Sequence, residues 1–589
     1  KIFSAIKSLK NIKKIDLTGI QIRGGNVFAE MLLSLLSLEE LVLANTNVTD
    51  SEYNAIFSAI KSLTKLRKLD LTGTNIPDVN SFAEMLSSIL QLKELVLANI
   101  HPTNIHPGVY YKIKCLKTLR KLNLGSPMDI TNTDTKKAFL NMLPSLRFLE
   151  DIVFPHIYLY GDATTEFFSA VASLKYLKSL DLVPISGDKC ITKNLASTLP
   201  SLQLLEKLRF TPSNDYCHCC DDDDDDDNDD DDEEHQSEFF RAQVNLRYLQ
   251  ELHLEDRPIT QTGVKALSEV LPSLHLLEKL TLSIAEFDDK CERQLFAAIR
   301  KLGWLKELKL LVEEGTTLLK GTLAEALPSL QLLEKLKFSG NFVDSENTKL
   351  FVAALRSFKY LQELYLEMKL HYRIVTKTLA EVLPSLQLLE NLVLKEIFML
   401  DESLNQLFAA LGSLKYLKKL KLSKCGIAED SAESLAEVLP SLQFLESLVL
   451  RRFYFPNGSE KQVFVALRSL KYLKKFQLSF CDIAKDSAET LAEVLLSLQL
   501  LEELKLTQLD LSNSDQRLFT AVQSLSYLKK LVLCSTKISP AGTRNLTTVL
   551  PTLRSLTFIW FPQIQHDENL EFRKRLVEVA RGIPGLDFR

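Results

Sequence analysis

The sequence predicts an α/β solenoid (horseshoe) of about 20 repeats with a 28-residue period, in which a parallel β-sheet lies on the concave face and helices lie on the convex face. Three observations predict it: one hydrophobic pattern recurs from end to end, its period is nearly constant, and an amphipathic segment follows each occurrence. Such periods are typical of arrays in which each repeat buries its apolar face against its neighbours. The chain is therefore interpreted as one array over 1–589 rather than as several globular domains.

The recurring pattern is L-x-x-L-x-L, which occurs 20 times. Every step between Leu249 and Leu501 spans 28 positions, and nearly all other steps span 25 to 30. The exception is the step from Leu205 to Leu249, which spans 44 positions and so carries an insertion of 16. The pattern predicts a short strand in each repeat, because alternate side chains of a strand point to the same face.

The segment after each strand predicts a helix. Residues 430–439, for example, place Ala432, Leu435 and Leu439 on one face behind Asp430, a plausible N-cap. Proline lacks the backbone N–H that a helix interior needs, so a proline after the apolar stretch should end the helix. Such prolines occur at Pro272, Pro328, Pro384, Pro440 and Pro551.

Two kinds of repeat alternate, SLKYLKKLKLSKCGI and SLAEVLPSLQFLESLVL, so the true unit is a pair of repeats with twice the single period. Residues 413–450 and 469–506 match at 28 of 38 positions, which indicates recent duplication of the pair. Helices pack about 10 Å apart and strands about 4.8 Å apart, so the helical side of the array is longer and the array must curve.

The pattern L-x-x-L-x-L-x-x-C-x-I, as in Leu417–Ile427 and Leu473–Ile483, resembles the leucine-rich repeat. The 28-residue period and the two alternating repeat types resemble its ribonuclease-inhibitor subclass, which also forms the C-terminal region of the nucleotide-binding, leucine-rich-repeat (NLR) innate immune receptors. This resemblance covers essentially the whole chain. It implies a scaffold for ligand sensing and autoinhibition in such a receptor, and it leaves the partner open because the scaffold hosts many.

Composition indicates a water-soluble fold in a reducing compartment. Hydrophobic residues make up 46% of the chain, yet no apolar stretch approaches the roughly 20 residues of a membrane-spanning helix. The nine cysteines are an odd number and do not fall into paired spacings. Because structural disulfides are rare in the cytosol, we expect a cytoplasmic location.

The insertion is strongly acidic. From Asp221 to Glu234, every position except Asn228 is Asp or Glu, and the rest of the chain carries a net positive charge. Such a run repels itself and buries no apolar area, which predicts a disordered loop over 217–235 beside the concave face. Weak contact of this loop with a basic partner or with the basic body is an alternative.

Metal-ligand side chains flank the acidic run, but zinc sites use spaced ligands, and a calcium loop needs a fixed glycine turn. We therefore expect no specific metal site and no cofactor. The chain also lacks a phosphate-binding loop, a nucleophile elbow and a zinc-protease motif, so we expect no enzymatic activity. The flanking residues are Cys217, His218, Cys219, Cys220 and His235.

The residue after each first leucine alternates in charge along the chain, as in Glu390, Lys418, Glu446, Lys474 and Glu502. Opposite charges on neighbouring strands stabilise a sheet by a few tenths of a kcal/mol per pair, so we predict a self-neutralising charge ladder. A nucleic-acid site needs a stripe of one sign. We therefore do not expect nucleic acid as a partner.

Partner recognition is expected on the concave face where this ladder is broken. One predicted patch is acidic and the other is basic and aromatic, and tyrosine and arginine are typical of interface hot spots. The alternative for each residue is an ordinary solvated surface position. The candidates are His253, Glu255, Asp256, Tyr365, Glu367, Lys421, Arg451, Arg452, Tyr454 and Phe480. The neighbouring Phe453 and Phe455 align with core positions and are expected to be buried.

The expected function is recognition of a protein partner or ligand on the concave face or its rim. The chain begins at Lys1, part-way through a repeat, so we expect it to be a fragment whose upstream domain is also a partner, and we expect 562–589 to cap the array. Three alternatives stay open. They are a free-standing binder resembling the ribonuclease inhibitor, which is richer in cysteine, a GTPase-activating regulator resembling the Ran GTPase-activating protein, and a structural scaffold.

Overall fold

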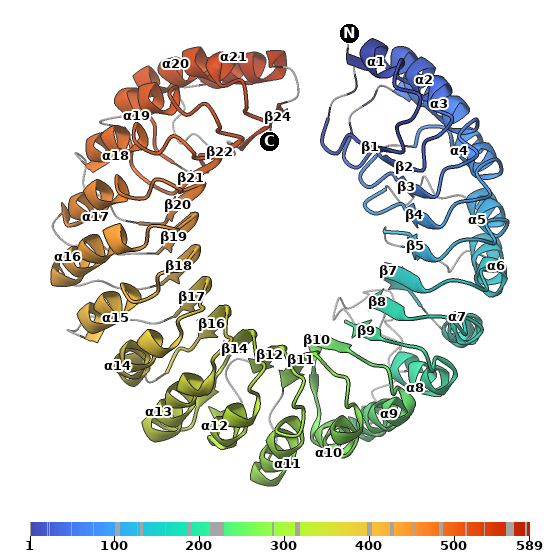
Figure 1. The fold of residues 1–589 in the computed structure, drawn as a ribbon, viewed down its shortest axis with the longest axis horizontal. Coiled ribbons are helices and arrows are strands. Elements are labelled where there is room, and N and C mark those ends of the chain that lie inside the picture. Colours follow the sequence, from blue (N-terminus) through green and yellow to red (C-terminus); the bar gives the residue numbers. More distant parts are fainter. Residues whose placement is uncertain are drawn as a thin grey trace. The chain divides into compact units, whose positions relative to one another are not determined.

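The structure is a computed structural model. It describes residues 2–588 except 21, 23, 47, 49, 75, 101–106, 126–127, 130–132, 160, 186–189, 212–228, 285–287, 313–317, 371, 397–402, 425–428, 453–454, 456–457, 482–486, 513–514, 535, 561–569 and 584–585. The chain divides into two compact units, Lys1–Trp304 and Leu305–Arg589. Within each unit, strands line one side and helices line the other (Figure 1).

In unit 1, strands that follow one another along the chain pair side by side in parallel. The strands are β1 Lys14–Asp16, β2 Glu40–Val42, β3 Lys68–Asp70, β4 Glu94–Val96, β5 Lys121–Asn123, β6 Met128–Asp129, β7 Asp151–Tyr158, β8 Ser179–Ile185, β9 Lys207–Phe210, β10 Glu251–Ile259 and β11 Lys279–Ile284. The helices are α1 Ile2–Ile6, α2 Gly25–Ser34, α3 Asp50–Ile60, α4 Val79–Leu86, α5 Pro107–Ile113, α6 Thr133–Met142, α7 Asp162–Ala172, α8 Cys190–Thr198, α9 Asp229–Ala242, α10 Gln261–Val270 and α11 Asp289–Ile299.

Unit 2 repeats this arrangement, again with parallel pairing in chain order. The strands are β12 Glu307–Val312, β14 Lys335–Ser339, β16 Glu363–Glu367, β17 Asn391–Lys395, β18 Lys419–Ser423, β19 Ser447–Arg451, β20 Lys475–Ser479, β21 Glu503–Thr507, β22 Lys530–Val532, β23 Phe558–Trp560 and β24 Asp587–Phe588, and β13 Leu318–Leu319 pairs with β15 Asn341–Phe342. The helices are α12 Thr322–Ala326, α13 Ser345–Ala354, α14 Tyr372–Val382, α15 Ser403–Leu411, α16 Glu429–Val438, α17 Glu460–Leu467, α18 Ser487–Leu495, α19 Asp515–Val522, α20 Pro540–Val549 and α21 Leu570–Gly582.

The strand register confirms the predicted 28-residue period. Leu392 lies opposite Leu420 and Leu394 opposite Leu422. All four side chains are buried. The leucine columns therefore form the core between sheet and helices, while the alternate strand residues face away from it.

Two details of the helix ends differ from the prediction. Helix α16 begins at Glu429, so Asp430 lies inside it rather than at the N-cap. Pro440 ends the α-helix, but the chain continues for one 3₁₀ turn, Leu439–Ser441, whose Ser441 hydroxyl donates to the Val438 carbonyl at 2.7 Å. A proline fits there because the first residues of a helical turn need no N–H partner.

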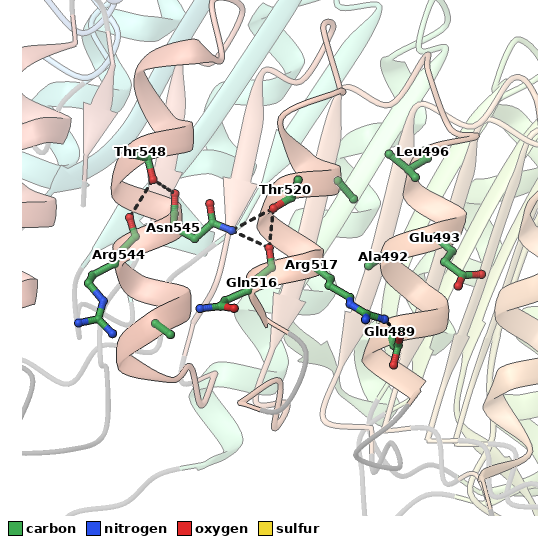
Figure 2. A pocket seen from close by; sticks show the side chains of 12 residues that line it. Glu489, Ala492, Glu493, Leu496, Gln516, Arg517, Thr520, Arg544, Asn545 and Thr548 are labelled. Atoms are coloured by element: carbon green, nitrogen blue, oxygen red, sulfur yellow. Dashed lines mark hydrogen bonds and ion pairs between the residues drawn. The ribbon is translucent and has the colours of Figure 1, made fainter.

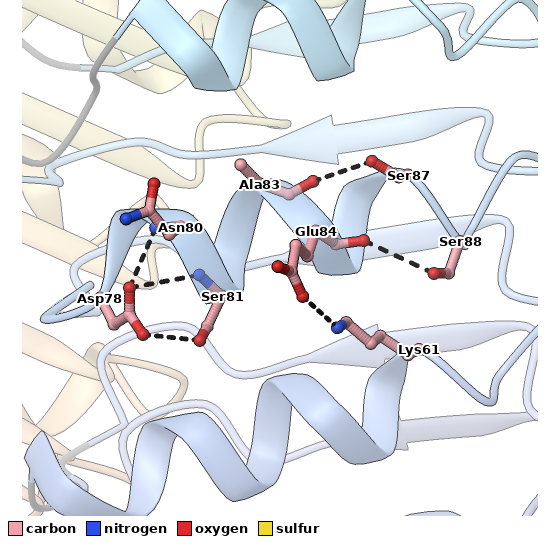
Figure 3. A network of polar contacts seen from close by, with 8 residues as sticks. All are labelled: Lys61, Asp78, Asn80, Ser81, Ala83, Glu84, Ser87 and Ser88. Atoms are coloured by element: carbon pink, nitrogen blue, oxygen red, sulfur yellow. Dashed lines mark hydrogen bonds and ion pairs between the residues drawn. The ribbon is translucent and has the colours of Figure 1, made fainter.

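Side chains at the helix starts satisfy the exposed N–H groups of the first turn. In α4, the Asp78 carboxylate accepts from the backbone N–H groups of Asn80 and Ser81 at 3.0 and 3.2 Å (Figure 3). On the same helix, Glu84 pairs with Lys61 at 2.6 Å. Such caps typically stabilise a helix by about 1 kcal/mol.

Two pairs of helices share a tie between repeats. The Gln236 Oε1 of α9 accepts from the Thr260 N–H at 2.7 Å and from the Thr260 hydroxyl at 2.8 Å, just before α10. Asp515 of α19 accepts from the N–H of Ser539, just before α20, and from its hydroxyl at 2.9 Å. Each tie fixes one helix N-terminus against the preceding helix.

The predicted insertion, 217–235, falls into two parts. Positions 217–228, including the cysteines and His218, lie outside the described residues. Asp229 to His235 form the first turns of α9, which corrects the expectation of disorder for that part. Negative residues are favourable near a helix N-terminus because they complement the helix dipole.

Within the described ranges, no three side chains of metal-ligand type come together. No helix in that part of the chain has the length and apolar character to cross a membrane. Cys115, Cys291, Cys481 and Cys534 are free thiols. In the predicted capping segment, β24 pairs in parallel with β23.

Candidate functional site

Ion pairs between neighbouring strands neutralise most of the concave face. Lys418 pairs with Glu390 at 2.8 Å, and Lys474 pairs with Glu446 at 3.1 Å. These pairs confirm the predicted charge ladder. A second column, which is the first residue of each strand, pairs in the same way, with Lys68 and Glu94 at 2.6 Å. Partly exposed pairs contribute about 0.2–1 kcal/mol each.

A cationic cluster breaks this neutrality in unit 2. It consists of Lys395 on β17, Lys421 on β18, Arg451 on β19 and Lys475 on β20, four successive strands. Burial lowers the pKa of Lys421, and the charges of the other three lower it further, while the nearby Glu367 carboxylate opposes this shift. Among the described residues, no carboxylate lies within 4 Å of the Lys421 ammonium. Two members of the cluster are paired with carboxylates, Lys395 with Glu367 at 3.3 Å and Lys475 with Glu503 at 3.0 Å, whereas Lys421 lies half-buried beside the other cations.

Tyr365 borders the cationic cluster on β16. Its hydroxyl donates to Glu367 at 2.5 Å, and the ammonium groups of Lys337 and Lys395 lie 4.7 and 5.0 Å from its ring centre. Burial alone would raise the pKa of Glu367, but the Tyr365 hydrogen bond and the Lys395 charge bring that pKa below its ordinary value. Lys395 lies 3.3 Å from Glu367 and thus links the tyrosine to the cluster.

Phe480 borders the cationic cluster on the opposite side. The guanidinium carbons of Arg451 and Arg452 lie 5.4 and 5.3 Å from its ring centre. The Phe480 side chain is 37% exposed, and both arginines are exposed. The structure therefore brings together Tyr365, Glu367 and the other predicted residues of unit 2 that it describes on one stretch of sheet. These others are Lys421, Arg451, Arg452 and Phe480.

The predicted acidic patch of unit 1 has a different character. His253 Nδ1 lies 2.9 Å from the Thr281 hydroxyl, and His253 Nε2 lies 3.8 Å from Glu251. Glu251 itself is paired with Lys207 and Lys279, both at 2.9 Å. His253 thus lies beside a carboxylate of the charge ladder, and the predicted acidic patch stays a prediction because the Asp256 side chain lies outside the described residues.

The remaining predicted positions near the patches are partly outside the described residues. Glu255 is half-buried on the same face of β10 as His253. The side chain of Asp256 and the whole of Phe453 and Tyr454 lie outside the described residues. Phe455 is buried, as predicted.

Sequence reasoning missed Lys395, Lys475 and Lys337. The strand residues that alternate with the buried leucines face the open side of the sheet. Lys395 is two residues after Val393 on the same strand, so this alternation would have placed it on the open side. Counting one residue outward from Leu336 would likewise have found Lys337.

A groove of about 720 Å³ lies on the opposite, helical side, between α18, α19 and α20 (Figure 2). Its rim carries an ion pair between Arg517 and Glu489. The Asn545 amide donates to the Gln516 carbonyl at 2.6 Å and lies 3.0 Å from the Thr520 hydroxyl. These polar groups bind each other, so the groove gives no sign of a specific ligand.

No known protein-family model matches the chain. A solved structure that matches is the crystal structure of a TLR13–ssRNA13 complex, at 16% identity and a TM-score of 0.40, over 93% of this chain and 76% of that chain. A likeness of this size carries no information about the ligand. Parallel strands in a 28-residue register, each followed by a helix, decide the fold class. The fold is an α/β leucine-rich-repeat solenoid.

Proposed function

We propose that this leucine-rich-repeat chain acts by binding rather than by catalysis, and that the concave face of unit 2 recognises an acidic protein partner. One observation carries the proposal. Lysines of the charge ladder are paired with carboxylates, whereas Lys421 is surrounded by Lys395, Arg451 and Lys475. A bound carboxylate relieves this repulsion, so the cationic cluster is complementary to an acidic surface.

The two aromatic side chains at the borders suit the same role. Tyrosine, tryptophan and arginine are enriched among the hot spots of protein interfaces. Aromatic rings give a large contact area at a small cost in conformational entropy. Tyr365 and Phe480 stand on either side of the cationic cluster and are both fixed by neighbouring cations. The partner is therefore expected to carry acidic groups between two apolar contacts.

We further propose that this recognition serves an NLR-type receptor, with the repeats as its sensing and autoinhibitory part. The support is the alternation of two repeat types at a 28-residue period, which resembles those receptors. Sequencing of the full-length transcript tests this point. A nucleotide-binding module encoded upstream of the repeats is the expected result, and a transcript without one contradicts the receptor role.

The binding proposal is tested with charge reversals. Lys421→Glu combined with Arg451→Glu should abolish recovery of the partners that the unmodified chain captures in quantitative affinity purification. The matched control is Lys461→Glu combined with Arg468→Glu, at helix α17, which changes the net charge equally. Equal recovery of the same partners by both variants and the unmodified chain contradicts the proposal. Wild-type melting temperatures for both variants show that any loss is local.

A further inference from the structure

We infer that Arg451, Arg452 and Phe480 form an anion clamp that binds a phosphorylated side chain of the partner. The inference rests on the proposed function and names the chemical group that the surface recognises. It starts from the shared ring, because both guanidinium groups lie against Phe480. An arginine held on an aromatic face keeps its planar fork of N–H donors in a fixed direction.

Backbone hydrogen bonds hold the three residues of the anion clamp in register. Arg452 N–H donates to the Ser479 carbonyl at 2.8 Å, and Phe480 N–H donates to the Thr507 carbonyl at 2.9 Å. Arg451 lies between Ser423 and Ser479 in the sheet. Both serines are small and buried, so no long side chain at these two paired positions covers the Arg451 guanidinium.

The backbone holds Arg452 and Phe480 in the same conformation. Their φ values are 51° and 56°, in the left-handed region that disfavours residues with a side chain. The equivalent residues of neighbouring repeats, Glu396, Lys424 and Gln508, also have positive φ, so this conformation is a feature of the repeat rather than of the anion clamp alone.

The anion clamp lacks a counter-ion among the described residues. In that part of the structure, Arg451 and Arg452 have no carboxylate within 4 Å. The equivalent lysine one repeat earlier, Lys424, is instead paired with Glu396. Lys421 adds a third cation beside Arg451. Three positive charges therefore converge where an external anion has access.

A phosphate monoester fits this convergence better than a single carboxylate. It carries nearly two negative charges at neutral pH and three acceptor oxygens, so it can bond both arginine forks at once. Clusters of arginine are a common way to recognise phosphorylated segments. A nucleic acid carries one charge per phosphate along a strand and needs a longer stripe of one sign, which the flanking ion pairs interrupt.

The test measures binding of the full chain to labelled peptide pools by fluorescence anisotropy. One set of pools has a central phosphoserine, phosphothreonine or phosphotyrosine in an acidic background, and matched pools have glutamate there. We expect the phosphorylated pools to bind at least about tenfold tighter than the glutamate pools. Arg451→Gln and Arg452→Gln should each weaken that binding by about tenfold or more, and Arg468→Gln should leave it unchanged.

Phe480→Gly separates anchoring of the arginines from folding. Glycine accepts the left-handed backbone, so the variant should keep its melting temperature while losing affinity for the phosphorylated pools. An unchanged affinity in Phe480→Gly overturns the role of the ring. Equal affinity for phosphorylated and glutamate pools, or no binding of the phosphorylated pools, overturns the anion clamp while leaving the charge-reversal test of the proposed function intact. Displacement of the phosphopeptides by inorganic phosphate at equal concentration, or tighter binding of a single-stranded oligonucleotide, also overturns it.

Discussion

Lys421 occupies a position that lowers the stability of the unliganded fold. Burial and three neighbouring cations lower the pKa of this ammonium group from its ordinary 10.5. Because the folded state then releases its proton at lower pH than the unfolded chain does, stability rises with pH between the lowered folded pKa and 10.5. At neutral pH the unfavourable contribution of the charge is fully present.

Replacing this charge should therefore stabilise the free protein. Lys421→Met keeps most of the length of the side chain, and we expect the free energy of unfolding at neutral pH to rise by up to about 0.5 kcal/mol, a limit set by solvent screening. Urea denaturation at neutral and strongly alkaline pH measures the effect, which should vanish at the alkaline end. A loss of stability of more than about 1 kcal/mol would mean that the ammonium group is favourably bonded.

Tyr365 has the opposite role, because its hydroxyl stabilises a carboxylate. The lowered pKa of Glu367 means that this stabilisation is present at neutral pH and is lost as the pH falls through the folded-state pKa. Tyr365→Phe should lower the free energy of unfolding by about 1–2 kcal/mol at neutral pH, and by less in acid. Tyr360→Phe is the control, since its ring is 52% exposed, and it should change little. Equal effects of the two substitutions in urea denaturation would contradict this account.

The helix-to-helix ties could not be predicted from the sequence, although the strands and helices could. Strands and helices followed from the leucine period, because that pattern depends only on residues close together in the chain. The ties join positions 24 apart in different repeats, Gln236 with Thr260 and Asp515 with Ser539. In both ties a glycine lies three residues after the Ser or Thr, at Gly263 and Gly542. This shared spacing is a sequence signal for the tie, but it can be recognised only after the two ties have been compared in the structure.

Gly542→Ala tests the tie. Alanine normally stabilises a helix relative to glycine by up to about 1 kcal/mol. Here a Cβ atom at position 542 would collide with the Asp515 carboxylate, so we expect destabilisation by about 1–3 kcal/mol. Gly303→Ala is the control, because no atom lies within 4 Å of its added Cβ. If Gly542→Ala is as stable as Gly303→Ala in thermal or urea unfolding, the Asp515 carboxylate can move away from the added methyl group without loss of stability, which would contradict this account.

At the scale of the whole molecule, the repeat period alone predicts the fold class, because every repeat has the same core. It predicts the binding surface only in part. Lys421, Arg451, Arg452 and Phe480 could be predicted as one patch from their places in the repeat, but Lys395 and Lys475 could not, because only the strand register places them beside Lys421. The ladder was predictable because charge alternates at one repeat position, whereas the cationic cluster combines different positions.

Stability in such an array is carried mainly by contacts between neighbouring repeats. Leu450→Ala, beneath the cationic cluster on β19, removes a fully buried side chain and should cost about 2–5 kcal/mol. Hydrogen exchange should accelerate in the adjoining repeats and stay nearly unchanged in the repeats of unit 1. Uniform acceleration throughout the chain would contradict this local accounting of stability.

The most direct test of the central claim is the affinity of the full chain for a labelled acidic peptide pool, measured by anisotropy with three proteins. They are the unmodified chain, Lys421→Glu with Arg451→Glu, and the control Lys461→Glu with Arg468→Glu. The account predicts that the first double variant loses at least about tenfold in affinity, while the control binds like the unmodified chain. Equal affinities for all three proteins would contradict it.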